Sequence, residues 1–371
     1  MNNNLKPAIR FKGFTEAWEQ RELGELCNIS TGKLDANAMV SDGQYDFYTS
    51  GIDVFKIDVA SFEGPAITIA GNGASVGYMH LADGKFNAYQ RTYVLTDFLA
   101  DRQFLNVAIG NELPDKIQEE VRGSGIPYIV LNMLTDLAIP FPTHEEQYAI
   151  GVYFRQLDNL ITLHQRKYDQ LVNVKKSMLE KMFPRDGKNV PEIRFAGFTE
   201  AWEQRKLGDI VKEISRNDPD SDAPIMMITA NNGFIEQSER YAFNNAGESL
   251  KKYILLEKGE LAYNHGASKL RPYGSCFALT TVERARIPFV YHCFSAENQN
   301  AEFISIELNG SDVENQLRRI VSSGARMDGL LNISFAEYVS VLVLLPKIEE
   351  QNRISDFFNY LDHLITLHQE K

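Results

Sequence analysis

The sequence has few cysteines, no membrane-length apolar run and no secretion signal. Its three cysteines, Cys27, Cys276 and Cys293, lack the paired spacing of zinc sites and of small disulfide-linked domains. No apolar stretch approaches the roughly 20 residues that cross a membrane. The N-terminal letters MNNNLKPAIRFKGF lack the apolar core of a signal peptide. We therefore expect a protein of the cytoplasm, a reducing compartment, with no contact with a membrane.

Common catalytic motifs are also missing. The sequence contains no GxxxxGK[ST] phosphate loop, no GxGxxG cofactor loop and no [ND]PP[YF] motif of adenine methyltransferases. None of the seven histidines stands at HExxH spacing. We expect no catalytic residue, no metal site and no cofactor bound by this chain itself.

Positive charge is in deficit as well. There are 38 Lys and Arg against 50 Asp and Glu, so the formal net charge is −12. A strongly acidic chain is not typical of a nucleic-acid binder, although a local basic surface or a basic partner can supply phosphate contacts. With 371 residues, 44% hydrophobic, the chain can form two or three domains.

The sequence is a tandem duplication. An opening motif at residues 9–26, IRFKGFTEAWEQRELGEL, returns at 193–210 with 14 of 18 positions identical. Residues 142–167, PTHEEQYAIGVYFRQLDNLITLHQRK, return at 346–371 with 15 of 26 identical. Each half therefore has an opening motif, a body of its own and a helical segment.

The first helical segment predicts one long helix over 143–183. Its apolar or ring residues follow alternating steps of four and three, which place them on a narrow seam that packs along another helix. Thr143 and Glu146 form a predicted capping box, and Pro184 and Gly187 a predicted stop. The second copy repeats the seam but ends at Lys371. The two copies of the seam are Ile150, Phe154, Leu157, Ile161 and His164, and Ile354, Phe358, Leu361, Ile365 and His368.

Two helices with the same stripe are expected to pack as an antiparallel pair, although each could instead pack on its neighbouring body. His164 and His368 would then hydrogen-bond across the pair; a metal site or a pH switch is the alternative. Trp18 and Trp202 of the opening motifs could anchor these motifs in the cores or serve as docking surface.

The two bodies share little sequence, and both predict mixed sheet with a few helices. We therefore predict an α+β fold: two mixed α/β domains separated by a pair of long antiparallel helices (a coiled coil), in a pseudo-two-fold tandem repeat. The expected segments are 1–142 with the first body, 143–183 for the first helix, 184–345 with the second body and 346–371 for a short second helix.

The repeated GFTEAWEQR and EEQ…LD.LITLHQ motifs, with unlike bodies between them, resemble the specificity subunit of type I restriction-modification enzymes over essentially the whole chain. The resemblance implies two target-recognition domains, each contacting one half of a split, asymmetric double-stranded DNA sequence. It also implies docking of two methyltransferase subunits and of restriction/translocase subunits. AdoMet, ATP and Mg²⁺ would belong to those partners. The alternative is an acidic, duplicated protein-interaction scaffold that does not bind DNA.

Candidate DNA contacts come from two polar, glycine-bounded stretches, 70–95 and 262–277, and from the turn at 231–232. Glycine lets the backbone approach a ligand closely, and Asn, Gln, Lys, Arg and Tyr contact bases and phosphates. Ordinary polar turns between strands are the alternative interpretation. The candidates in the first body are Asn72, Ser75, Lys85, Asn87, Tyr89, Gln90 and Arg91. Those in the second body are Asn231, Asn232, Asn264, Ser268, Lys269, Arg271 and Tyr273.

Overall fold

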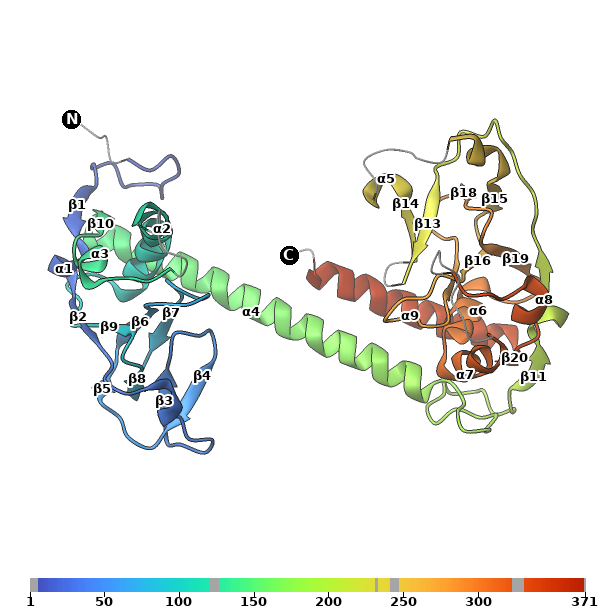
Figure 1. Ribbon diagram of the computed structural model, residues 1–371, viewed down its shortest axis with the longest axis horizontal. Helices are drawn as coiled ribbons and strands as arrows, with labels where there is room; N and C mark the ends of the chain where they lie inside the picture. The colour runs from blue at the N-terminus through green and yellow to red at the C-terminus, as the bar shows by residue number, and fades with distance from the viewer. Residues whose placement is uncertain (1–5, 121–126, 231–232, 241–246, 322–329, 370–371) are drawn as a thin grey trace. The chain divides into compact units, whose positions relative to one another are not determined.

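The computed structural model describes residues 6–120, 127–230, 233–240, 247–321 and 330–369. The chain divides into two compact units, Met1–Leu163 and His164–Lys371, which we describe separately (Figure 1). Helix α4, His144–Lys181, contributes residues to both units. The predicted α+β fold with a long helix is confirmed. The finer four-segment division stays a prediction.

The first unit contains two four-stranded sheets and three helices besides the start of α4. One sheet has the order β2-β9-β6-β7 with antiparallel neighbours, and the other has the order β4-β3-β8-β5. The strands are β1 Glu19–Glu22, β2 Asn28–Thr31, β3 Tyr45–Tyr48, β4 Val54–Ile57, β5 Phe62–Glu63, β6 Ala66–Ala70, β7 Met79–Ala82, β8 Lys85–Ala88, β9 Thr92–Thr96 and β10 Ala138–Phe141. The helices are α1 Leu23–Leu26, α2 Arg102–Glu120 and α3 Leu131–Thr135, with a short 3-10 turn at Ala36–Ala38.

The second unit contains a four-stranded sheet of order β12-β19-β16-β17 and smaller two-stranded sheets. Its strands are β11 Glu203–Lys206, β12 Val211–Glu213, β13 Met226–Thr229, β14 Gly233–Glu236, β15 Ile254–Glu257, β16 Leu261–Asn264, β17 Ser275–Ala278, β18 Arg284–Ile287, β19 His292–Ala296 and β20 Leu342–Leu345. Its helices are α5 Gln237–Arg240, α6 Ala301–Leu308, α7 Ser311–Ile320, α8 Phe335–Tyr338 and α9 Ile348–Gln369, with 3-10 turns at Leu207–Asp209 and Gly247–Lys252.

The two bodies share one sheet topology although their sequences differ. Strands β2, β9, β6 and β7 correspond in order and antiparallel direction to β12, β19, β16 and β17. A helix follows the last of these four strands along the chain in both units, α2 after β9 and α6 after β19. The sequence comparison missed this likeness because a buried sheet demands apolar side chains at alternating positions rather than particular ones.

The opening motif of each half is hydrogen-bonded to the strand that precedes the long helix. Strand β1 pairs with β10 in antiparallel register, Glu19 opposite Phe141. Strand β11 pairs with β20 in the same way, Glu203 opposite Leu345. The repeated motif therefore brings the beginning of each half against its end, which closes the body between them.

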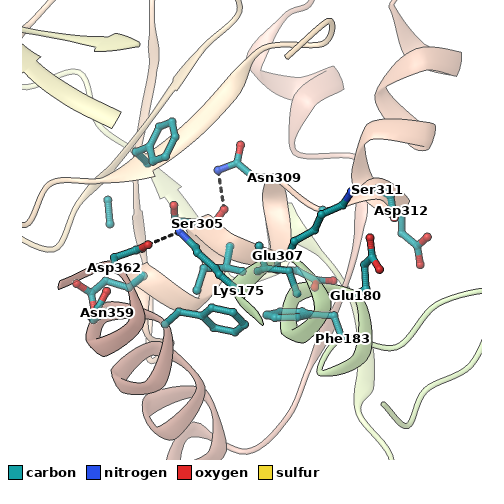
Figure 2. Close-up of a pocket in the computed structure, with 18 of the residues that line it drawn as sticks. Lys175, Glu180, Phe183, Ser305, Glu307, Asn309, Ser311, Asp312, Asn359 and Asp362 are labelled. Atoms are coloured by element: carbon teal, nitrogen blue, oxygen red, sulfur yellow. Dashed lines mark hydrogen bonds and ion pairs between the residues drawn. The ribbon is translucent and has the colours of Figure 1, made fainter. Parts of the chain in front are cut away.

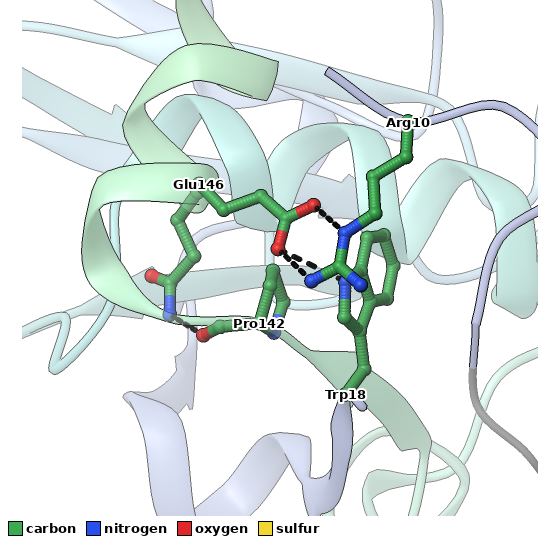
Figure 3. A network of polar contacts seen from close by, with 5 residues as sticks. Arg10, Trp18, Pro142 and Glu146 are labelled. Carbon is green, nitrogen blue, oxygen red and sulfur yellow. Dashed lines mark hydrogen bonds and ion pairs between the residues drawn. The ribbon is translucent and has the colours of Figure 1, made fainter. Parts of the chain in front are cut away.

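Buried polar side chains lock this closure in the first unit (Figure 3). The Glu146 carboxylate is 1% exposed and accepts two hydrogen bonds, both 2.7 Å, from the Arg10 guanidinium. It also accepts one of 3.1 Å from the Trp18 indole. The neighbouring Gln147 donates to the Pro142 carbonyl at 2.8 Å and accepts from the Asp101 amide at 3.1 Å. The predicted capping box is therefore wrong: charge-assisted bonds to Arg10 engage Glu146 instead.

The second unit repeats this lock with one change. Arg194 makes the same two bonds to Glu350, 2.6 and 2.7 Å, and Gln351 bonds to the Pro346 carbonyl and the Asn300 amide. Trp202 is 2% exposed, and its indole nitrogen has no hydrogen-bond partner among the described residues. Its ring packs against Phe183 and Phe303. Trp202 thus anchors its motif in the core of the second unit, whereas Trp18 is half-buried and contacts Glu146 and Phe104.

Helix α9 packs antiparallel to the C-terminal half of α4 within the second unit. His164 and His368 approach at 2.9 Å between their Nδ1 atoms, so one ring donates to the other. Further along α4, Lys175 forms an ion pair with Asp362, which lies before His368 on α9. The two contacts therefore run in opposite order along the two helices, as an antiparallel pair requires. Of the predicted seam, Ile354, Phe358 and Leu361 are buried in one core with Leu171 of α4, and Ile365 packs beside them.

The earlier part of the α4 seam has a different environment. Ile150 packs against the core of the first unit. Leu157 is half-buried, whereas Phe154 and Ile161 are 39% and 61% exposed. Their counterparts in the repeat, Phe358 and Ile365, are covered by α4. The described structure therefore brings the seam together only from His164 onward.

We expect Gln147→Ala to destabilise the protein by roughly 2–4 kcal/mol, because it leaves the Pro142 carbonyl and the Asp101 amide buried without partners. Urea unfolding of the full chain measures this loss. Gln165→Ala, an exposed change on the same helix, is the control and should stay within about 0.5 kcal/mol. Equal losses from both variants would contradict a locking role for Gln147.

Candidate nucleic-acid interface

The candidate interface of the first unit lies where β6 ends and β9 begins. These strands are neighbours, with Ala70 opposite Thr92, so the turns after β6 and before β9 meet at one edge of the sheet. The Gly71 amide donates to the Arg91 carbonyl at 2.9 Å. A Cβ atom on Gly71 would lie 2.2 Å from that carbonyl oxygen, so this close approach requires glycine.

Four of the predicted residues share this edge: Asn72, Ser75, Gln90 and Arg91. Gln90 and Arg91 are exposed, whereas Asn72 and Ser75 are half-buried. The Asn72 side-chain oxygen accepts a bond of 2.7 Å from the Ser50 hydroxyl. Its amide group has no partner among the described residues, which leaves two N–H donors for a ligand.

The structure adds three residues to this edge that the sequence did not single out. Tyr128 forms an isolated backbone bridge with Asn72 and is 49% exposed. Tyr78 is 41% exposed and packs edge-on against His80 at 4.9 Å. Burial lowers the pKa of His80, which favours a neutral ring. Tyr78 stood within the stretch already chosen, but nothing in the sequence could place Tyr128 beside Asn72.

The remaining first-unit candidates lie elsewhere. Lys85 is exposed at the start of β8, opposite Glu63 of β5, whereas Gln90 and Arg91 follow the end of this strand. Tyr89 is half-buried, and its backbone bonds to the Tyr48 carbonyl. Asn87 is 1% exposed, donates to the Val59 carbonyl and the Ser61 hydroxyl at 2.8 and 3.1 Å, and accepts from the Ala88 amide. The Asn87 side chain is therefore occupied inside the body.

The second unit has an equivalent edge. Tyr263 of β16 stands opposite His292 of β19, as Ala70 stands opposite Thr92. An isolated bridge joins Gly266 to Leu330 where Asn72 joins Tyr128 in the first unit. The Leu331 amide bonds to the His265 carbonyl just as the Ile129 amide bonds to that of Gly71. Both bodies thus present the turn after the same strand at the same place.

The second-unit candidates divide between this turn and the interior. Ser268 and Lys269 are exposed, and the Ser268 hydroxyl accepts from the Arg271 amide at 3.0 Å, which shapes the turn. Arg271 donates to the Asn309 carbonyl at 2.8 Å, and burial lowers its pKa. The other two described candidates, Asn264 and Tyr273, make hydrogen bonds within the unit.

Asn264 donates to the Ile228 carbonyl and accepts from the Gly266 amide. Tyr273 is half-buried, and its carbonyl accepts from the Tyr263 hydroxyl at 2.6 Å. Asn231 and Asn232 lie outside the described residues. The exposed polar side chains of this turn are therefore Ser268 and Lys269, next to Leu270, which is 61% exposed.

Residues that could hold a metal do not gather in the described part of the chain: no three His, Cys, Asp or Glu side chains form a metal-binding group there. The three cysteines are free and buried, and burial raises the pKa of the Cys27 and Cys276 thiols to about 12. Within the described ranges, none of the helices combines the length and apolar character required to cross a membrane.

The fold is a duplicated one, in which sheets of the same strand order present different polar turns at equivalent edges. Residues 15–173 match the family described as type I restriction modification DNA specificity domain. This match agrees with the resemblance to type I restriction-modification specificity subunits that the repeats indicate.

The chain is also similar to two type I restriction enzyme specificity subunits and to one solved S subunit. A segment of 144 residues is 43% identical to the type I restriction enzyme EcoDI specificity subunit of Escherichia coli, covering 39% of this chain and 31% of that protein. Another of 98 residues is 29% identical to the MjaVIII specificity subunit of Methanocaldococcus jannaschii, covering 26% of this chain and 23% of that protein. The matches thus span a third or less of either relative.

The likeness in fold extends over the whole chain. The crystal structure of a type I restriction-modification system S subunit from M. genitalium matches 100% of this chain and 93% of its own, with a TM-score of 0.62 and 16% identity. This likeness in fold also covers the residues after 173, which lie outside the family match.

We expect Asn87→Ala to destabilise the protein by roughly 2–3 kcal/mol, because its buried amide satisfies two carbonyl or hydroxyl oxygens and one backbone amide. Asn28→Ala, on the exposed face of the edge strand β2, should change stability by less than about 0.5 kcal/mol. Urea unfolding compares the two variants. If Asn87→Ala left stability unchanged, the side chain would be free to serve another role.

Proposed function

We propose that this protein is the DNA-recognising specificity subunit of a type I restriction-modification complex. Each body contacts one half of a split, asymmetric DNA target, and other subunits carry out methylation and cleavage. The observation that carries this proposal is the equivalent sheet edge of the two bodies, which presents Asn72, Gln90 and Arg91 in one and Ser268 and Lys269 in the other. One scaffold with two sets of polar residues suits two different half-sites.

The exposed residues fit the division of labour at DNA interfaces. Amide side chains such as those of Asn72 and Gln90 make paired hydrogen bonds to base edges, adenine above all, whereas Arg91 and Lys269 can neutralise phosphates. Tyr78 and Tyr128 add exposed rings at the same edge. The proposed interface has few basic residues, and the whole chain has a net charge of −12. We therefore expect partner subunits to supply further contacts with phosphates.

Two methyltransferase subunits and restriction/translocase subunits are the proposed protein partners. AdoMet, ATP and Mg²⁺ would be bound by those partners and not by this chain. On this proposal the chain is not an enzyme by itself; it directs a DNA-modifying and DNA-cleaving complex to its target in the cytoplasm.

The acidity of the chain favours one alternative, a duplicated scaffold that binds proteins and not DNA. The two functions differ in a gel-shift experiment with the methyltransferase subunits present. A specificity subunit gives a shift that depends on DNA sequence and weakens with salt. A scaffold gives no sequence-dependent shift.

Arg91→Ala should weaken binding of the assembled complex to its selected target by about tenfold and lower the salt dependence by about one phosphate contact. The Gly71–Arg91 backbone bond survives this change, so the edge keeps its shape. Lys85→Ala, at the opposite end of β8, is the matched control and should bind as the wild type does. Fluorescence anisotropy over a salt series measures both. If Arg91→Ala and Lys85→Ala weakened DNA binding equally, the edge that carries Arg91 would not be the DNA interface.

We propose further that α4 sets the gap between the two half-sites. Removing residues 156–162, one heptad, should shorten the helix by about 10 Å, or roughly three base pairs of B-DNA, with little rotation. Selection from random DNA should therefore return unchanged half-sites with a narrower gap. Altered half-sites at the original gap would contradict this role of α4.

A further inference from the structure

A cavity in the second unit lies outside the proposed DNA interface. It has a volume of about 440 Å³ and lies among the C-terminal turns of α4, helix α6, the start of α7 and helix α9 (Figure 2). Phe183, Phe277 and Phe358 supply apolar lining. This volume is in the range of pockets that bind small molecules or single side chains.

Glu307 of α6 is the buried acid of this cavity. It is 9% exposed, and one carboxylate oxygen, Oε1, accepts from the Leu344 amide at 2.9 Å. The other oxygen, Oε2, has no hydrogen-bond partner in the described part of the chain. Burial raises the pKa of Glu307 to about 7; the bond from the Leu344 amide opposes this shift, and the nearby Asp312 adds to it. An ionised carboxylate without a partner is costly in such a place.

The other charged groups around the cavity leave Glu307 without a counter-ion. Lys175 is paired with Asp362, and Asn359 donates to Glu302. Arg271 also lines the cavity, but it donates to the Asn309 carbonyl and makes no ion pair with Glu307. The charged residues that line the cavity besides Glu307 are Lys175, Lys176, Arg185 and Arg271, and Glu180, Glu302, Asp312 and Asp362.

The balance of charge in the lining favours a cationic occupant, although the buried Nε–H of Arg271 has no acceptor among the described residues. The first turn of α7, where backbone amides could attract an anion, already carries Asp312 and Glu314. Five carboxyl groups line the cavity against four basic side chains. A donor that meets the free oxygen of Glu307 would satisfy the buried group, and a positively charged donor would do so most strongly.

We propose that this cavity binds an ammonium or guanidinium group, which donates a hydrogen bond to Oε2 of Glu307. The phenylalanine rings cover the aliphatic part of the occupant, and the carboxylate holds its cationic end. The same chemistry is offered by a free polyamine and by an arginine side chain of a protein partner. The binding is linked to protonation, because the cation binds to the ionised carboxylate and displaces the proton that burial favours.

The test is isothermal titration calorimetry on the full chain with two probes, spermidine and N-acetyl-arginine amide. Glu307→Gln keeps an acceptor for the Leu344 amide, so the variant should fold. Glu180→Gln is the matched control, since it removes one carboxylate from the same lining. The wild type should bind about tenfold more tightly at pH 8 than at pH 6, following the ionisation of Glu307. Proton release below pH 7 is detected by comparing buffers of different ionisation enthalpy.

Glu307→Gln should weaken binding at pH 8 at least tenfold and abolish the pH dependence, whereas Glu180→Gln should change the affinity by less than about twofold. Binding of spermidine alone would identify a free polyamine as the occupant, and binding of the arginine probe alone a protein side chain. Equal affinities for wild type and Glu307→Gln, or no binding of either probe at about 10 mM, would overturn the proposal.

A stability measurement checks the state of Glu307 without a ligand. Because the folded pKa lies above that of an ordinary carboxyl group, the wild type should lose thermal stability as pH rises from about 4.5 to 7 and change little above that range. Glu307→Gln should remove this part of the pH profile. If Glu307→Gln kept the same pH dependence of thermal stability as the wild type, Oε2 of Glu307 would already have a partner. That result would also contradict the proposal.

Discussion

The buried contact between an arginine of the opening motif and a glutamate of the long helix is the constraint on which each half of this protein depends. Arg10 holds Glu146 and Arg194 holds Glu350, each through two short bonds to a carboxylate that is 1% exposed. Without its arginine, each glutamate would be a buried, unpaired charge. Because the arginine precedes the body and the glutamate follows it, the pair requires the chain to close around whatever body lies between.

This constraint explains why the repeats are so alike and the bodies so different. The repeated glutamine beside each glutamate bonds to the proline carbonyl before the long helix. It also bonds to the backbone amide just before α2 in the first unit, or before α6 in the second. These contacts need particular side chains at particular positions. The sheet of each body needs only apolar residues on its buried face, so its exposed turns are free to differ. Different turns at equivalent edges suit the proposed recognition of two different half-sites.

The two halves nonetheless differ where α4 and α9 meet. Trp18 donates to Glu146, whereas Trp202 packs among the rings of Phe183 and Phe303. Phe183 follows the end of α4 and packs against Trp202 and Phe303. Phe154 and Ile161 are exposed, whereas Phe358 belongs to the core of the second unit and Ile365 packs against it. The last turns of α4 form one wall of the cavity around Glu307.

The sequence by itself determined the duplication, the long helix, the mixed α and β character of the bodies and the family resemblance, because repeats and periodic apolar patterns are local properties of the chain. It also selected the two short stretches whose turns the structure places at equivalent sheet edges. Only the tertiary structure decided that the bodies share one sheet order, that Asn87 and Arg271 are engaged inside, and that Tyr128 lies beside Asn72. These outcomes depend on which strands pair and which carbonyls meet, over separations of tens of residues. A polar side chain in a turn has the same appearance in the sequence whether it faces water or bonds to a distant backbone group.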